Sequence, residues 1–191
     1  MNAHAILDLM EEVGKLKLLP RTGWLLRGLR NVESIADHSY RVSLLAMILA
    51  DCLNEDGMDV NVETVMRIAL LHDIAESQMG DIPHPATRYI PEDVKEKGER
   101  AAVQEMVETF GMLGDRYVAL WHSFEDASTL EAKIVRVADK LEMMIQAFEY
   151  ESVGYRSLND FWGNTANFRH FSDYPLVQEI MGLLQERRHN R

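Results

Sequence analysis

Apolar residues recur every three or four positions along most of the chain, which is the period of a helix with one buried face. No stretch shows the strict alternation that is typical of a half-buried strand. The sequence therefore predicts an all-α fold, with an irregular aromatic stretch over residues 154–169 packed on the bundle. In chain order, helices are expected over residues 3–19, from Ser34 or Asp37 to Leu53, from Asn61 or Glu63 to Gly80, and over 91–110, 115–125, 128–148 and 175–184.

Polar residues mark where two of the long helices are expected to begin. Ser34 or Asp37 can cap the second helix, which places His38 in its first turn. Ser128 and Glu131 have the spacing of a capping box, in which each side chain accepts a hydrogen bond from the backbone of the other. The sequence therefore predicts Ser128 as the cap of the helix that follows it.

An adjacent pair, His72 and Asp73, interrupts the apolar run of the third expected helix. Neighbouring residues on a helix project about 100° apart, so both side chains can reach one point near the axis of a bundle. Glu76 lies one turn beyond His72 on the same face, and Asp81 follows on the loop after Gly80. Buried polar groups are costly unless something satisfies them, and a divalent metal ion can satisfy this group.

Residues elsewhere in the chain can complete such a site. His38 lies upstream, and Asp139 stands in the middle of a later apolar helix, where an unpaired aspartate is rare. Glu142, one turn further on, can hydrogen-bond to a metal ligand without binding the metal itself. Lys140 is expected to pair with residues outside the site. Two imidazoles and two carboxylates fit Mn, Co, Ni, Fe(II) or Zn better than Ca or Mg.

This set of residues suits hydrolysis of a phosphate ester. Four protein ligands on a six-coordinate ion leave positions for a water and a substrate oxygen. A metal ion lowers the pKa of bound water from 15.7 toward about 7 in strong cases. Glu76 and Asp81 can orient that water or protonate the leaving group.

The connector over residues 21–30 is a second candidate for ligand binding. It holds Arg21, Arg27 and Arg30 together with Trp24. Three cations and a large ring suit an anion that carries a flat ring, and arginines hold phosphate oxygens well. The alternative is that Trp24 anchors the loop on the core while the arginines are solvated.

Composition narrows the classes of function. The chain has 191 residues, 47 % of them apolar, which is enough for one domain with a core. Its formal net charge of −11 disfavours a nucleic-acid polymer as partner.

No apolar run approaches the roughly 18 residues of a membrane span. Residues 1–12 lack a secretory pattern, so a cytoplasmic location is expected. The one cysteine, Cys52, excludes an internal disulfide and a cysteine-based zinc cluster.

The order of the candidate ligands resembles that of the HD-domain metal-dependent phosphohydrolase superfamily, named for its paired histidine and aspartate. The match is His38, then His72-Asp73, then Asp139. Further stretches are similar to the 5′-deoxynucleotidase branch of this superfamily, so the resemblance covers most of the chain. They are residues 19–24, 33–38, 71–76, 80–82, 131–133, 146–151 and 158–161.

The resemblance implies one HD domain over residues 1–191, a helical bundle with a core of about 20–150 and a C-terminal helical extension over 151–191. It also implies a homodimer that hydrolyses deoxyribonucleoside 5′-monophosphates to deoxynucleoside and phosphate. Carried over by position, the metal ligands would be His38, His72, Asp73 and Asp139, and the catalytic carboxylates Glu76 and Asp81. Trp24 would crowd the position of a ribose 2′-hydroxyl and so select deoxyribose.

The chain departs from the bacterial 5′-deoxynucleotidases that it resembles at one position. Those enzymes place an arginine that contacts phosphate directly before the tryptophan, whereas this chain has Gly23. Arg21 or Arg27 is therefore expected to take that role.

Two other functions compete with this one. The first is an HD hydrolase of another nucleotide, namely a nucleoside triphosphate, a cyclic dinucleotide or a guanosine tetraphosphate. The second is a binding module stabilised by a structural metal ion. Structural sites are closed, whereas catalytic sites keep a position for water. A structural site would not require Glu76 and Asp81.

Overall fold

The helical periodicity of the sequence corresponds to ten α-helices in a computed structural model, which describes residues 3–191. Residues 1 and 2 of the expected 1–191 domain lie outside the described part. The helices are α1 (Ala3–Gly14), α2 (Thr22–Leu25), α3 (Ile35–Glu55), α4 (Val62–Leu71), α5 (Glu76–Met79), α6 (Glu92–Val107), α7 (Met112–Asp126), α8 (Leu130–Ser152), α9 (Asn159–Gly163) and α10 (Pro175–His189). Short 3-10 helices span Lys15–Lys17, His84–Arg88, Glu108–Phe110, Thr165–Phe168 and Phe171–Asp173.

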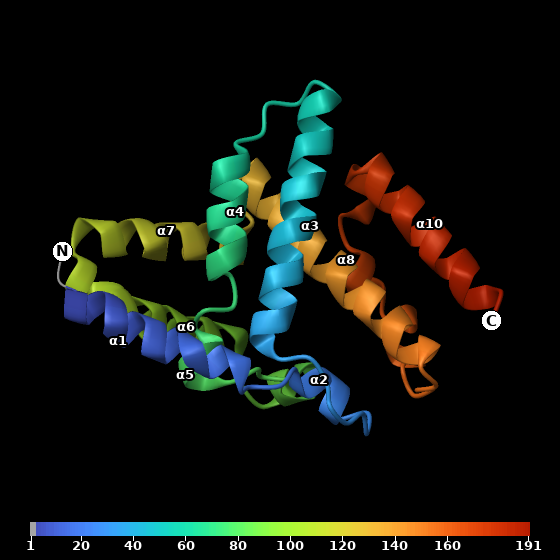
Figure 1. Ribbon diagram of the computed structural model, residues 1–191, viewed down its shortest axis with the longest axis horizontal. Helices are drawn as coiled ribbons and strands as arrows, with labels where there is room; N and C mark the ends of the chain where they lie inside the picture. The colour runs from blue at the N-terminus through green and yellow to red at the C-terminus, as the bar shows by residue number, and fades with distance from the viewer. Residues whose placement is uncertain (1–2) are drawn as a thin grey trace.

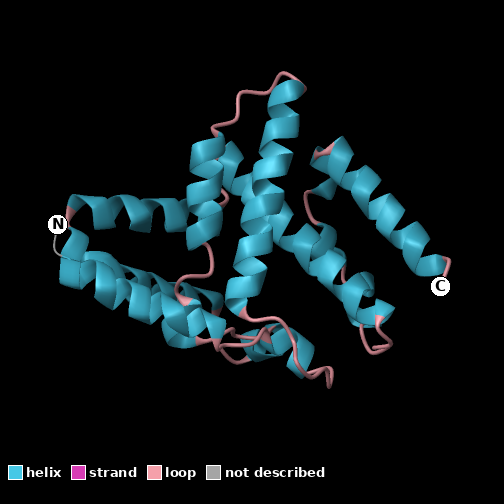
Figure 2. Ribbon diagram, in the orientation of Figure 1, coloured by secondary structure: helices cyan, strands magenta, loops and turns pink. Residues whose placement is uncertain are grey.

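The prediction of an all-α fold is confirmed. Figure 2 shows helices and loops throughout, and no strand occurs within residues 3–191. The first helix is shorter than predicted, because its α-helical part ends at Gly14 and a 3-10 turn continues to Lys17. Across the same described range, no helix combines the length and apolar character needed to cross a membrane.

The core lies where α3, α4 and α8 pack against one another, with α8 crossing behind α3 (Figure 1). Their apolar faces meet in one cluster that includes Val42, Ala46, Ile68, Leu141 and Met144, all fully buried. Burying one such large side chain stabilises the fold by roughly 1.5–3 kcal/mol before entropy is counted. The three helices are therefore held rigidly enough to bring residues far apart in sequence to one place.

The C-terminal part packs on this bundle, including the aromatic stretch over residues 154–169, for which this packing was predicted. Helix α10 lies along one side of α8 (Figure 1) and adds Val177, Met181 and Leu184 to the cluster. Phe161 and Phe168, from the irregular aromatic stretch, pack against the same cluster.

The N-terminus of α3 carries the predicted cap. The Ser34 side chain accepts the Asp37 backbone N–H, and the Asp37 carboxylate accepts the Ser34 backbone N–H. This reciprocal arrangement satisfies two backbone donors, and an N-cap of this type is worth about 1 kcal/mol. Ser34 is thus the cap, and His38 lies in the first turn of α3.

The capping box predicted at Ser128 is wrong. Thr129 is the N-cap of α8, and its hydroxyl accepts the Ala132 backbone N–H. Glu131 does not turn back toward Ser128, because its carboxylate accepts the backbone N–H of Asn61 at the start of α4. A contact across the bundle has replaced the local one.

The helix predicted to run continuously through Glu76 is broken. Helix α4 ends at Leu71, residues 72–75 form a turn, and α5 starts at Glu76. His72 Nδ1 lies 2.7 Å from the Ala69 carbonyl oxygen, which a continuing helix would use for the N–H of Asp73. The chain tightens here into three-residue hydrogen bonds, such as Glu76 N–H to the Asp73 carbonyl. The pair His72 and Asp73 therefore lies at a helix end.

Candidate metal centre

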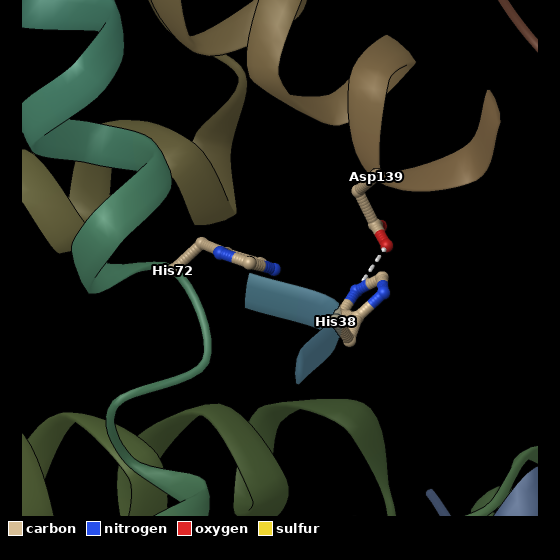
Figure 3. Close-up of side chains that lie close together, drawn as sticks. All are labelled: His38, His72 and Asp139. Atoms are coloured by element: carbon tan, nitrogen blue, oxygen red, sulfur yellow. Dashed lines mark ion pairs between the residues drawn. The ribbon is translucent and has the colours of Figure 1, made fainter. Parts of the chain in front are cut away.

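Three helices each bring one buried side chain to a common point. His38 comes from α3, His72 from the end of α4 and Asp139 from α8, and Figure 3 shows the three side chains converging. Their ligand atoms lie within 4.8 Å of one another. His38 Nε2 is 3.2 Å from Asp139 Oδ1. The packing of α3, α4 and α8 fixes this arrangement.

Asp73 adds a second carboxylate to the cluster. Its Oδ2 lies 3.2 Å from His72 Nε2 and 3.8 Å from His38 Nε2. The structure therefore brings together all four residues that the sequence suggests as metal ligands. Two imidazole nitrogens and two carboxylates make the mixed nitrogen and oxygen set that suits transition-metal ions.

Hydrogen bonds orient both imidazoles so that Nε2 faces the cluster. His38 Nδ1 lies 2.6 Å from Glu142 Oε2, and both side chains are buried. His72 Nδ1 lies 2.7 Å from the Ala69 carbonyl oxygen. Because both partners are acceptors, each Nδ1 carries the proton. Within residues 3–191, both Nε2 atoms are buried and have no hydrogen-bond partner.

Each of these nitrogens faces a carboxylate oxygen at 3.2 Å, Asp139 Oδ1 for His38 and Asp73 Oδ2 for His72, without making a hydrogen bond of good geometry. A cation between the imidazole nitrogens and the carboxylates would satisfy both kinds of atom. Imidazoles that bind metal ions commonly donate their other N–H to a carboxylate or a backbone carbonyl, as His38 and His72 do here. The residues present can therefore hold a divalent metal ion.

The pKa shifts in the cluster reflect its carboxylate groups. Burial and the Arg21 charge lower the pKa of His38, but Asp139 and Glu142 outweigh them and raise it to about 9. Burial raises the pKa of Asp73, whereas His72 and Arg21 outweigh it and hold that pKa well below the usual range. Metal-free protein therefore holds a proton on His38 where a metal ion would supply positive charge.

Glu76 lies beside the cluster as a carboxylate without a close donor. Its Oε2 is buried, has no hydrogen bond within the described residues, and lies 3.7 Å from Arg21 Nη1. Burial and the neighbouring Asp73 charge raise the pKa of Glu76 well above its ordinary value, against the opposing effect of Arg21. Glu76 therefore keeps its proton to a higher pH than an ordinary glutamate does.

Asp81 is engaged with the start of α2. Its Oδ2 accepts the Thr22 backbone N–H at 2.7 Å, and its backbone carbonyl accepts the Thr22 hydroxyl at 2.9 Å. These contacts hold the connector over residues 21–30 against the loop after α5.

The two arginines expected to bind phosphate have different surroundings. Arg21 borders the cluster, and its Nη1 lies 3.0 Å from Asp73 Oδ2. Arg27 pairs with Asp160 at the surface, and its guanidinium lies over the ring of Phe161. The structure therefore brings Arg21 to the candidate ligands, whereas Arg27 contacts α9 and donates to the Gly23 carbonyl oxygen in α2.

Trp24 is buried and fixed on both its face and its edge. Its ring stacks on Phe161 with centroids 4.5 Å apart, and its Nε1 donates to Glu33 Oε1 at 2.9 Å. It is 2 % exposed. These contacts match the part of the alternative in which Trp24 anchors the connector. The other part, in which the arginines are solvated, does not hold for Arg21 and Arg27, because both pair with carboxylates.

Two charged residues of this region have contacts that the sequence did not predict. Glu33 lies in a loop without periodicity, yet its carboxylate is within 4.8 Å of ligand atoms of His38 and Glu142. Burial and the Glu142 charge raise the pKa of Glu33 to about 7. Lys140 was expected to pair away from the site, but its Nζ lies 3.1 Å from Asp139 Oδ2.

A cavity of ≈ 680 Å³ is linked to the cluster through Lys140, which lines it and whose Nζ contacts Asp139 Oδ2. Its volume is within the range of about 300–1,000 Å³ that is usual for small-molecule sites. Ile82, next to Asp81, and Lys140, next to Asp139, contribute to its wall. The other lining residues include His84, Thr87, Lys95, Glu99, Glu125 and Arg136.

Comparison with known proteins agrees with this geometry. A model of the HD domain family matches residues 13–172. The human protein named 5′-deoxynucleotidase HDDC2 is 37 % identical over 182 residues, covering 93 % of this chain and 85 % of that protein. The Schizosaccharomyces pombe protein named 5′-deoxynucleotidase hdd1 is 35 % identical over 193 residues, covering 96 % of this chain and 90 % of that protein.

Solved structures show the same fold. A conserved hypothetical protein from Pyrococcus furiosus superimposes with a TM-score of 0.80 at 35 % identity, covering 96 % of this chain and 99 % of that one. A protein described as a predicted metal-dependent phosphohydrolase, from Magnetospirillum magnetotacticum, has a TM-score of 0.70 at 26 % identity, with coverages of 96 % and 93 %. From its helices, its His and Asp residues and these relatives, the chain belongs to the HD domain family.

Proposed function

We propose that this chain is a metal-dependent 5′-deoxynucleotidase, which hydrolyses deoxyribonucleoside 5′-monophosphates to deoxynucleoside and phosphate. The observation that carries the proposal is the pair of buried, unsatisfied imidazole nitrogens facing two carboxylates. The names of the curated relatives, which match nearly the whole chain, support the substrate class.

In this proposal His38, His72, Asp73 and Asp139 hold one divalent transition-metal ion, with Mn, Co, Ni, Fe or Zn preferred to Mg. Once bound, such an ion neutralises phosphate charge and lowers the pKa of water. The residues of the chain keep the two imidazoles oriented and the site largely closed to bulk water.

Glu76 is the proposed catalytic acid or base. Its raised pKa lets it carry a proton that can pass to the leaving 5′-oxygen, or take one from the attacking water. Asp81 is the second proposed catalytic carboxylate, and it also fixes the start of α2 through Thr22. Trp24, held by Phe161 and Glu33, is the proposed barrier to a ribose 2′-hydroxyl, since a rigid ring rejects an added group by clash.

We also propose that the enzyme is a cytoplasmic homodimer. Tyr40, Leu44 and Ile48 form an exposed apolar row on α3, at the i, i+4, i+8 spacing that another helix face can cover. Sedimentation at micromolar concentration tests this part, and a monomer there would contradict it.

The decisive experiment measures phosphate release after chelation and reloading with Mn, Co, Ni, Zn or Mg in turn. Deoxynucleoside monophosphates should release phosphate in at least one transition metal, and their ribose counterparts should release far less. For a nucleoside triphosphate, a cyclic dinucleotide and a guanosine tetraphosphate, chromatography of the nucleotide products replaces the phosphate assay, because their hydrolysis need not free phosphate. Turnover of one of these alone would replace the proposal with another hydrolase, and no turnover of any nucleotide with any metal would leave a binding module.

Two variants separate metal binding from catalysis. Glu76→Ala should keep its metal content and lose about 10²–10⁴-fold in turnover, the usual contribution of a positioned acid or base. Asp73→Ala should lose both metal and turnover. Wild-type turnover in Glu76→Ala would show that the assigned role is wrong.

A further inference from the structure

Two of the arginines near Trp24, Arg21 and Arg27, are already engaged by carboxylates. Arg21 Nη1 contacts Asp73 Oδ2 at 3.0 Å and lies 3.7 Å from Glu76 Oε2. Arg27 pairs with Asp160 on the surface. Gly23 carries no side chain. A phosphate dianion in this site would therefore compete with Asp73 for Arg21, and it needs a further cation.

Lys140 lies where such a cation is needed. Its Nζ is 3.1 Å from Asp139 Oδ2, and the other oxygen of that carboxylate is 3.2 Å from His38 Nε2. One carboxylate thus separates the ammonium group from the imidazole nitrogens. The Lys140 side chain is 43 % exposed, against 11 % for Asp139, so the ammonium lies on the open side of the site.

Lys140 also lines the ≈ 680 Å³ cavity and so connects it to Asp139. The other nearby cations of that wall have different partners. Arg136 donates to the carbonyl oxygens of Phe124 and Glu125, and Lys95 pairs with Glu99. An ammonium group has three donors on a flexible stem, so Lys140 can keep its contact with Asp139 and still donate to a second anion.

We propose that Lys140 binds the phosphate group of the substrate, in the role that Arg21 and Arg27 were expected to fill. The inference rests on the proposed function for the identity of the substrate, but its test depends only on phosphate binding. The competing explanation is that Lys140 serves only to neutralise Asp139. In that case its loss would change metal affinity and leave phosphate affinity unchanged.

The test uses Lys140→Met, which keeps the stem and removes the charge, and Lys140→Arg, which restores a charge. Calorimetry of the metal-loaded protein measures the Kd of inorganic phosphate, and competition with a chelator measures the Kd of the metal. We expect Lys140→Met to weaken phosphate binding about 10- to 100-fold, the range of a charge-assisted hydrogen bond. Metal affinity should change less than threefold, and Lys140→Arg should recover most of the loss.

Lys133→Met is the matched control, because Lys133 lies seven residues earlier on α8 and is exposed. It should bind phosphate as the wild type does. An unchanged phosphate Kd in Lys140→Met, an equal loss in metal affinity, or no phosphate binding by the wild type would overturn the inference. If the wild type binds phosphate through Lys140 but releases none from deoxynucleotides, the proposed function fails and this inference stands.

Discussion

Replacing Glu142 with glutamine should weaken metal binding, although Glu142 is not a proposed ligand. Its Oε2 lies 2.6 Å from His38 Nδ1, and both side chains are 1 % exposed. The carboxylate fixes the ring and makes Nε2 a better donor to a cation. A glutamine keeps the shape of the side chain but removes the charge, and its amide can present N–H to the ring.

The magnitude follows from the position of the contact. Groups that support a metal-bound imidazole are typically worth 10- to 100-fold in metal affinity. This equals about 1.4–2.7 kcal/mol, since each factor of ten is about 1.36 kcal/mol. Buried hydrogen bonds are electrostatically stronger than exposed ones, so we expect the upper half of that range. The proposed ligands themselves remain in place.

The assay is competition between the protein and a chelator of known affinity, with Mn and Co at constant pH. Glu149→Gln is the control, because Glu149 and Glu142 both contact Arg41, whereas Glu149 is 48 % exposed and does not reach His38. Its metal Kd should stay within twofold of the wild type. A change below threefold in Glu142→Gln, or an equal effect in the control, would refute the role of Glu142 in orienting His38.

Three further predictions concern protons and packing. The pKa of His38 is raised to about 9 in the metal-free protein, so binding of a metal ion at pH 7.5 should release about one proton. Calorimetry in two buffers with different heats of ionisation measures this release, and a release of no protons would contradict the prediction. The pKa of Glu33 rises from 4.5 to about 7 on folding, so wild-type stability should fall between those pH values. Metal-free Glu33→Gln lacks this loss and should gain about 1–3 kcal/mol over the wild type between pH 5 and 8 in urea unfolding; a pH-independent difference would argue against it. Leu141→Ala, at a fully buried position of α8, should cost about 2–5 kcal/mol by the same method, and a loss under about 1 kcal/mol would count against the packing described.

The features that could be predicted from the sequence are those encoded by local spacing. The apolar period of α3 and α8 specifies both the helices and their buried faces. The start of α3 could be predicted from Ser34, because a capping box involves residues only three positions apart. Asp139 stood out because an aspartate in an apolar helix needs a partner, and the structure supplies His38 and Lys140.

The features that could not be predicted depend on contacts between distant segments. The end of α4 follows from the contact of the His72 ring with the Ala69 carbonyl, which leaves no periodic signal. The ion pair of Arg27 with Asp160 and the hydrogen bond from the Asn61 N–H to Glu131 join residues that are far apart in sequence, so both depend on the folded chain. Glu33 lies in a loop, where burial is decided by the helices around it.

Because α4 ends directly before His72 and Asp73, the main chain itself contributes charge here. The peptide dipoles of a helix sum to about half a negative elementary charge at the C-terminus, and the effect is confined to the last turn. This negative potential adds to that of the neighbouring carboxylates, and the main chain at the end of α4 therefore favours a cation at this position.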